Sequence, residues 1–246
     1  MDENVYVFNL LAALLYAIVG ARLLALSRRT RARPEKLLAA NYLATGASYL
    51  LYEHAGLIGI ELQWLLVAGR IIYSVGLVPL LIFTRDVFRR GSPWANALTW
   101  STLLGMFAGV LFSTLQGDIE GVVISSPWFW LDWAGYTIPY VWISAEALIA
   151  RSAALKRARI GLCDAETANR FLLWALFGAF ASVAGISLIP LYLEYDVTQI
   201  WPLWGDFVSG GCEAASTLML WLAFFPPARY RRWVNRGSRP ARDVER

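Results

Sequence analysis

Apolar residues in this chain gather in long runs that short polar segments separate. A helix needs roughly 20 apolar residues to cross ~30 Å of membrane hydrocarbon. Seven runs reach this length and predict spans at Val5–Leu26, Leu37–Leu57, Leu62–Phe83, Pro93–Thr114, Trp128–Ala150, Phe171–Leu193 and Pro202–Phe225. The expected fold is an all-α, seven-transmembrane-helix bundle, in which the gap between the second and third spans is the weakest boundary.

The composition agrees with a membrane protein. Of the 246 residues, 58% are hydrophobic and only 16% are charged, whereas soluble domains carry about 25% charged residues. Mean hydropathy is +0.49. The acidic start MDENVYVFN differs from the basic start of a secretory signal, so we expect the first apolar run to remain as a helix.

The basic residues predict the orientation of the bundle. They follow the first, third, fifth and seventh spans, in SRRTRARPEK, RDVFRR, RSAALKRAR and ARYRRWVNRGSRPARDVER. Of the 22 Lys and Arg residues, all except Arg70 lie within these four segments or close beside them. Because cytoplasmic loops retain basic residues, we expect the N-terminus outside and the C-terminus in the cytoplasm, in a bacterial inner (plasma) membrane. Residues 1–226 would form the membrane domain and 227–246 a basic cytoplasmic tail.

Several classes of chemistry lack their residues. The two cysteines, Cys163 and Cys212, lie far apart, and His54 is the only histidine. A thiolate metal site, a bis-His haem and a Ser-His-Asp relay are therefore not expected. We expect no enzyme activity, cofactor or metal, and no nucleic-acid binding, because no folded domain presents the basic charge.

Polar residues inside the predicted spans follow helical stripes. The stripes are Asp132, Tyr136, Pro139, Ile143 and Glu146 in span five, Asp206, Gly210, Glu213 and Thr217 in span seven, and Gln63, Arg70 and Ser74 in span three, with Tyr73 adjacent. Ionisable groups at membrane depth are rare, and they usually face a bundle interior or a cavity. The stripes therefore predict an interior polar site.

Arg70 is expected to form an ion pair in the outer half of the membrane. Carboxyl groups at similar depth belong to Asp206, which is the first choice, and to Asp132, Glu53 and Glu61. Such a pair has two readings of equal weight, a static link between helices or part of a working site.

The carboxyl groups away from Arg70 have different expected roles. Glu213 should be uncharged, because no basic residue is expected at its depth, and with Asp206 it favours a functional role. Asp132 fits a helix-start residue, and Glu146 fits a pair with Arg151, so both favour structural roles. The Trp residues and the segment WLAFFPPARYRRW are typical of membrane interfaces.

Two resemblances follow from these residues. RRTRARPEK after the first span and WLAFFPPARYRRW after the last resemble a group of uncharacterised bacterial seven-helix membrane proteins. The chain also resembles microbial rhodopsins, whose third helix carries an Arg followed, nine residues on, by a Pro and leucines. Arg70 and Pro79 have this spacing, and Asp206 matches the Asp that precedes the retinal-linking Lys.

The chain departs from the rhodopsin pattern at two positions. Gly210 occupies the position of the retinal-linking lysine, and Tyr73 that of the counter-ion. The resemblance therefore implies no Schiff base, and instead a bundle whose interior pocket holds an apolar or lipid-like ligand without a covalent link.

Three functions remain open. The first is a receptor- or sensor-like protein that binds a small or lipid-like ligand at Arg70, Asp206 and Glu213, with Asp132, Tyr136, Tyr73 and Gly210 lining the site. The second is a proton-coupled or small-solute transporter, and the third is an accessory helical subunit of a larger complex. The expected partners are the lipid bilayer, the ligand, and a cytoplasmic protein or a second copy of the chain.

Overall fold

The computed structural model describes residues 3–57, 63–119, 123–194 and 203–236; among these, the side chains of residues 3–9, 52–57, 63, 192, 203, 206 and 236 are not described. This part of the chain contains no strand. Its helices are α1 (Glu3–Thr30), α2 (Arg33–Leu57), α3 (Gln63–Phe88), α4 (Pro93–Leu115), α5 (Pro127–Arg159), α6 (Ala165–Glu194), α7 (Leu203–Phe224) and α8 (Ala228–Arg236). The all-α expectation is confirmed.

Each of the first seven helices coincides with one predicted span. The helices extend beyond the apolar runs mainly at their basic ends, and α5 continues to Arg159, nine residues past its predicted end at Ala150. Arg, Lys and Ala are strong helix formers, so a helix does not stop where the apolar run stops. By contrast, α7 ends at Phe224, two residues before Pro226 and Pro227, the pair that was expected to end it.

Five helices, α1, α3, α4, α6 and α7, are long and apolar enough to cross a membrane. The protein is therefore a multi-pass helical membrane protein. As far as they are described, α2 and α5 do not reach the same apolar content. The α5 helix carries Asp132 and Glu146, and α2 carries Asn41, Thr45 and Ser48 among its apolar residues. The count of spans thus depends on these two helices.

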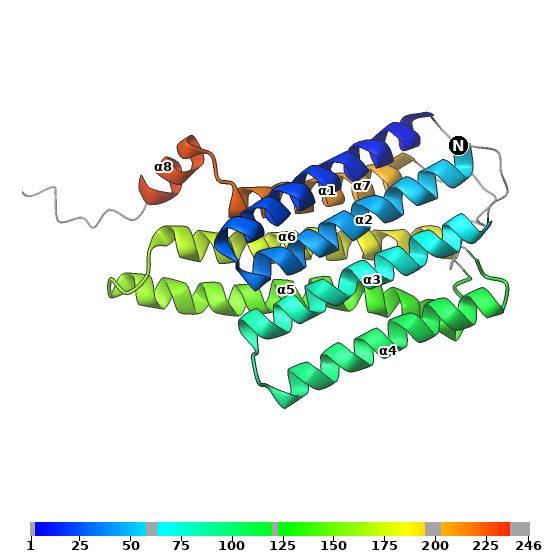
Figure 1. The fold of residues 1–246 in the computed structure, drawn as a ribbon, viewed down its shortest axis with the longest axis horizontal. Coiled ribbons are helices and arrows are strands. Elements are labelled where there is room, and N and C mark those ends of the chain that lie inside the picture. Colours follow the sequence, from blue (N-terminus) through cyan, green and yellow to red (C-terminus); the bar gives the residue numbers. More distant parts are fainter. Residues whose placement is uncertain (1–2, 58–62, 120–122, 195–202, 237–246) are drawn as a thin grey trace, which may run out of the picture.

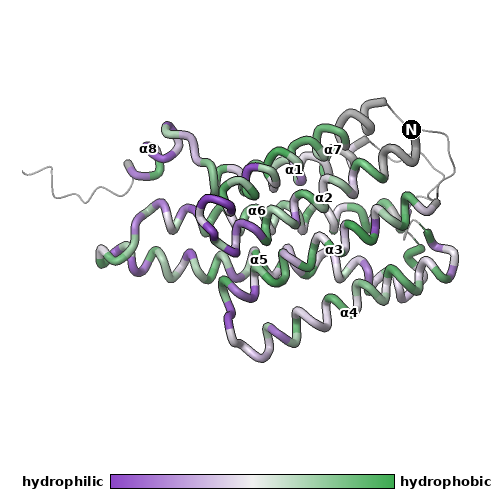
Figure 2. Tube along the Cα trace, viewed as in Figure 1, coloured by the Kyte–Doolittle hydropathy of each residue, from purple (hydrophilic) through white to green (hydrophobic). Residues whose placement is uncertain are grey.

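The helices form a ring in chain order. Consecutive helices from α1 to α7 pack side by side, and α7 returns to α1, which closes the ring (Figure 1). The α3 helix also contacts α5, so α4 lies outermost against these two. Figure 2 shows hydrophobic residues along the helices and hydrophilic residues concentrated at the end that carries α8. Large apolar side chains face outwards, among them Trp100, Leu104 and Phe207, which are 65%, 74% and 60% exposed.

Two turns are set by local capping. Gly117 adopts a left-handed φ of 87° after α4, a conformation that costs glycine little. At the start of α6, the Asp164 carboxylate accepts a hydrogen bond from the Thr167 backbone N–H at 2.6 Å. The first turn redirects the chain towards α5, and the second begins a helix just after the α5–α6 turn.

Close helix contacts depend on glycine. A Cβ atom added to Gly109 of α4 would lie 2.5 Å from the Asp132 backbone nitrogen of α5. A Cβ on Gly178 of α6 would lie 2.9 Å from the Ser144 nitrogen, where Ser144 Oγ also donates to the Ala175 carbonyl at 2.8 Å. Small residues thus bring α4 and α6 directly against α5.

Candidate functional site

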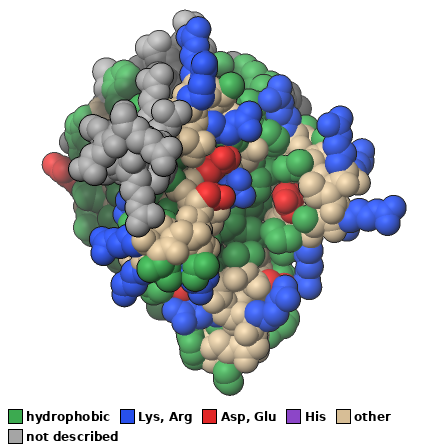
Figure 3. Space-filling model, turned by 90° about the vertical axis from the view of Figure 1, so that its left-hand side faces the viewer, with side chains coloured by type: hydrophobic (Ala, Val, Ile, Leu, Met, Phe, Trp, Pro, Cys, Tyr) green, Lys and Arg blue, Asp and Glu red, His purple; other side chains and the backbone are tan. Residues whose placement is uncertain are grey.

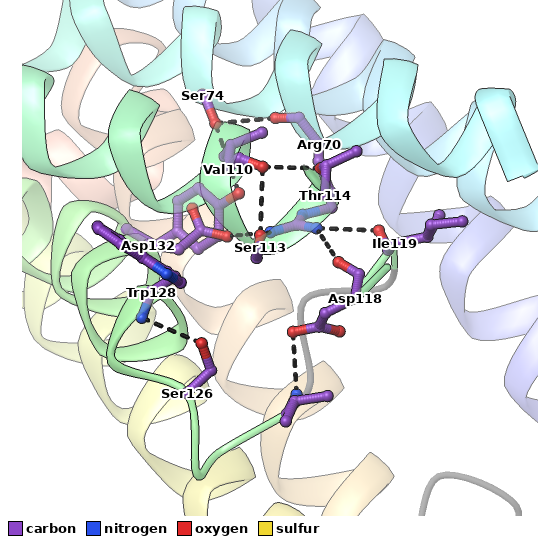
Figure 4. A network of polar contacts seen from close by, with 12 residues as sticks. Arg70, Ser74, Val110, Ser113, Thr114, Asp118, Ile119, Ser126, Trp128 and Asp132 are labelled. Atoms are coloured by element: carbon purple, nitrogen blue, oxygen red, sulfur yellow. Dashed lines mark hydrogen bonds and ion pairs between the residues drawn. The ribbon is translucent and has the colours of Figure 1, made fainter. Parts of the chain in front are cut away.

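Arg70 lies at the centre of a buried polar network that joins three helices (Figure 4). Its Nη2 atom is 2.6 Å from Asp132 Oδ2 and 2.8 Å from Ser113 Oγ. Its Nη1 atom donates to the backbone carbonyls of Asp118 and Ile119 at 3.0 and 2.9 Å. The side chains of Arg70 and Asp132 are 2% and 4% exposed, so the pair is shielded from solvent.

This network holds residues 116–119, which directly follow α4, against α3. The Gly117 turn places two carbonyl groups where the guanidinium reaches them, and Ser126 caps α5 by accepting a hydrogen bond from the Trp128 N–H at 3.3 Å. Asp132 therefore lies beyond the first turn of α5, and the expectation that it begins the helix is wrong. A guanidinium has five donors in a rigid fork, which suits one carboxylate and several carbonyl groups at once.

Tyrosine hydroxyl groups continue the polar region beyond Arg70. Ser74 Oγ donates to the Arg70 carbonyl at 2.9 Å and lies 3.4 Å from the Tyr136 hydroxyl. The rings of Tyr136 and Tyr73 are 5.0 Å apart in an edge-on arrangement, and the Tyr73 and Tyr140 hydroxyls are 3.5 Å apart. A band of hydroxyl groups from α3 and α5 thus starts at the ion pair.

Glu213 forms the second polar centre. It projects from α7, and its carboxyl accepts a short hydrogen bond from the Tyr49 hydroxyl of α2. Tyr16 of α1 packs its ring 5.6 Å from that of Tyr49. The hydroxyl groups of Tyr73 and Tyr140 lie within electrostatic range of the Glu213 carboxyl, so the two centres face the same interior space.

Some buried hydroxyl groups between these centres are incompletely bonded. Tyr42 is 1% exposed and Thr45 is 3% exposed, yet neither hydroxyl has a hydrogen-bond partner among the described residues. The Thr217 hydroxyl lies near Tyr42 and Tyr16 but donates to the Glu213 carbonyl at 3.0 Å. Buried polar groups in proteins are normally bonded, often to water or a ligand. The Tyr42 and Thr45 hydroxyls are therefore buried groups whose hydrogen bonds are not made within the described residues.

Glu146 occupies a separate site at the basic end. Its two oxygens accept hydrogen bonds from Arg89 Nε at 2.8 and 2.9 Å, and Trp142 Nε1 donates at 3.2 Å. The expected pair with Arg151 along α5 is therefore wrong. The partner, Arg89, directly follows α3, and its guanidinium also lies 5.5 Å from the Trp94 ring.

The predicted site residues divide into three groups. The structure brings together Arg70, Asp132, Tyr136 and Tyr73, and it places Glu213 on the same interior. Asp206, the first-choice partner of Arg70, lies on α7, but its side chain is outside the described part of the structure. The side chain of Glu53 on α2 and the whole of Glu61 lie outside it as well. Gly210 is half-buried, and a Cβ atom added there meets nothing within 4 Å, so no close packing contact requires this glycine.

Sequence reasoning missed the contribution of α2. Tyr42, Thr45 and Tyr49 follow spacings of three, four and seven residues, which place them on one helical face. That stripe could have predicted the contribution of α2 from the sequence. The carbonyl partners of Arg70 could not have been predicted, because every residue has a backbone carbonyl and the sequence pattern does not distinguish them. Among the described residues no group of His, Cys, Asp and Glu gathers as metal ligands.

Comparison with known proteins adds no family to this picture. No family model, curated protein or solved structure matches the chain. The resemblances to bacterial seven-helix proteins and to microbial rhodopsins stay predictions.

Proposed function

We propose that the chain crosses the plasma membrane seven times, with its N-terminus outside and its C-terminus in the cytoplasm. The α2 and α5 helices, of 25 and 33 residues, are long enough to span and occupy places in the same ring as the five apolar helices. Polar side chains lower their apolar content, but those of Tyr42, Thr45, Asp132 and Glu146 face the interior or other helices. Figure 3 shows Lys and Arg around the end that would face the cytoplasm.

We further propose that the protein is a receptor or sensor for a small polar or lipid-like ligand. The observation that carries this proposal is the Glu213–Tyr49 hydrogen bond beside the unpartnered hydroxyls of Tyr42 and Thr45. A bound molecule that satisfied those hydroxyls would compete for Glu213. Binding would thereby loosen the side-chain link between α7 and α2.

In this proposal, α7 carries the effect of ligand binding from the interior to the cytoplasmic end of the protein. This helix leads into α8 through Pro226 and Pro227, and Arg22 of α1 lies 4.6 Å from the Trp221 ring, which holds the end of α7 against α1. A shift of α7 would move α8 and the basic cytoplasmic tail that follows it. A separate cytoplasmic protein, or a second copy of the chain, would read that movement.

Mass spectrometry of the purified protein tests the ligand. We expect a small molecule to co-purify with the wild type, and Thr45→Val and Tyr49→Phe to lower its occupancy several-fold. Thr102→Val is the matched control, because the Thr102 hydroxyl on α4 is also buried without a partner. Equal occupancy in all variants, or an interior that holds no molecule, would contradict the sensor and favour an accessory helical subunit.

A proton-coupled transporter is the second candidate. The observation that favours it is the band of Tyr136, Tyr73 and Tyr140 hydroxyls between the Asp132 and Glu213 carboxyl groups. Hydroxyl groups and carboxyl groups can pass protons along such a band. Proton uptake by proteoliposomes that Glu213→Gln abolishes would support transport, whereas no uptake by the wild type would exclude it.

A further inference from the structure

A notch at the basic end of the molecule lies between α6, the end of α7 and α8. It opens to the surface, and its lining comes mainly from these three elements. One part of its lining is apolar, with Leu173 and Ala223 only 4% and 2% exposed. The other part is polar and includes Arg170 of α6 and Arg231 of α8. An apolar floor beside cationic side chains matches an amphiphile with a negative head group.

The notch is a built part of the fold. Asn169 of α6 and the Tyr230 hydroxyl of α8 exchange hydrogen bonds at 2.9 and 3.1 Å, which fixes α8 against α6. Tyr230 and Val234 line the notch, while Trp233 on the flank of α8 is 68% exposed. Short amphipathic helices with an exposed Trp and several Arg lie at membrane interfaces.

The cations of the notch are available to a ligand. Arg231 makes no ion pair among the described residues. Arg170 forms a long ion pair, 3.9 Å, with Glu166, which also lines the notch, and it attracts the nearby Asp164 carboxylate outside the lining. One carboxylate opposes two guanidinium groups, so the notch has a net positive charge. Guanidinium groups bind phosphate oxygens in a two-pronged geometry.

We propose that this notch binds an anionic phospholipid of the cytoplasmic leaflet, with the lipid phosphate held between Arg170 and Arg231. The acyl chains would run along the apolar surface of α6 and α7. The inference rests on the proposed topology, which places α8 at the cytoplasmic surface, and it is independent of the interior ligand. Lipid binding would hold α8 in the position that Asn169 and Tyr230 define.

Native mass spectrometry of the full chain in detergent, titrated with phosphatidylglycerol or phosphatidylcholine, tests this inference. We expect one phosphatidylglycerol to be retained by the wild type in preference to phosphatidylcholine. Arg170→Gln with Arg231→Gln should lower the apparent affinity at least about tenfold, because each guanidinium would lose its charge-assisted hydrogen bonds to the phosphate. Arg229→Gln with Arg232→Gln removes the same charge outside the notch lining and should change the affinity less than about twofold, because exposed charges at a distance are screened.

Three results would overturn the inference. An equal loss of lipid affinity in both pairs of variants would indicate diffuse attraction, and no loss in either pair would show that the arginines do not bind the lipid. Displacement of the lipid by inorganic phosphate at equal concentration would indicate a free-anion site. If the double variant does not fold, Arg231→Gln alone serves, because that side chain is exposed and forms no ion pair among the described residues. Cysteine labelling of the two membrane faces reports the topology separately, so the two proposals fail distinguishably.

Discussion

The Arg70 guanidinium of α3 and the Asp132 carboxylate of α5 are 2.6 Å apart and almost completely buried, in a bundle whose outer surface is apolar. Sixty-two residues separate them in the chain. The pair holds α3 against α5 and secures the loop after α4 through two carbonyl groups. A guanidinium in such a place is tolerated because one carboxylate, one hydroxyl and two carbonyl groups accept its hydrogen bonds.

Breaking this pair should be costly. Arg70→Gln leaves the Asp132 carboxylate buried without its counter-charge, and we expect a loss of about 3–5 kcal/mol in the free energy of unfolding. Ser113→Ala removes one neutral acceptor and should cost only about 1 kcal/mol. Denaturation in detergent measures both. A smaller effect for Arg70→Gln than for Ser113→Ala would show that the pair contributes little.

The Glu213–Tyr49 contact should appear as an energetic coupling between α2 and α7. Tyr49→Phe leaves a buried carboxyl without its donor, and we expect a loss of about 1–3 kcal/mol. In a double-mutant cycle with Glu213→Gln, the two effects should differ from additivity by at least about 0.5 kcal/mol. Strict additivity in thermal unfolding would argue that the two side chains act independently.

Two arginine variants compare the observed partner of Glu146, Arg89, with the partner expected from the sequence, Arg151. Arg89→Gln should lower the melting temperature, because it removes charge-assisted hydrogen bonds to the buried Glu146 carboxylate. Arg151→Gln, the control, should change stability by less than about 0.5 kcal/mol. Comparing their melting temperatures checks this, and equal shifts would contradict the assignment of Arg89.

Two glycines make a matched pair for packing. Gly109→Ala places a methyl group against the Asp132 backbone, and we expect a loss of about 1–3 kcal/mol. Gly210→Ala meets open space and should be neutral or stabilising by up to about 1 kcal/mol through helix propensity. Unfolding measurements on both variants decide the matter. A destabilising Gly210→Ala would mean that α7 has a neighbour at this position.

The Asp164 cap predicts a pH dependence outside the membrane. Its hydrogen bond with Thr167 lowers the pKa of the Asp164 carboxyl below the ordinary value. The cap is therefore fully formed at neutral pH and is lost as pH falls through the lowered pKa. Asp164→Asn keeps a capping oxygen without this titration, so its stability relative to wild type should rise as pH falls below the ordinary aspartate pKa of about 3.9. A pH-independent difference between the two proteins would contradict the prediction.

The elements were readable from the sequence for a simple reason. Long apolar runs specify helices of membrane length, and the coincidence of α1 to α7 with those runs reflects the need to satisfy every backbone group within the helix. The stripe through Asp132 and Tyr136 also placed these residues on one face correctly. Helical periodicity determines which residues share a face, and it carries this information without any tertiary contact.

Partners across helices were decided only by the tertiary structure. Arg70 had several carboxyl groups at similar depth, and which one it meets depends on which helices are neighbours and how they are rotated. The approach of α4 to α5 at Gly109 and the contact of α3 with α5 set that geometry for Asp132. The same holds for Glu146, whose charged neighbour along its own helix was not its partner. The sequence by itself determined the helices, the four basic segments and the polar faces, because these are local properties. The pairing of the buried charges required the packing of the whole ring.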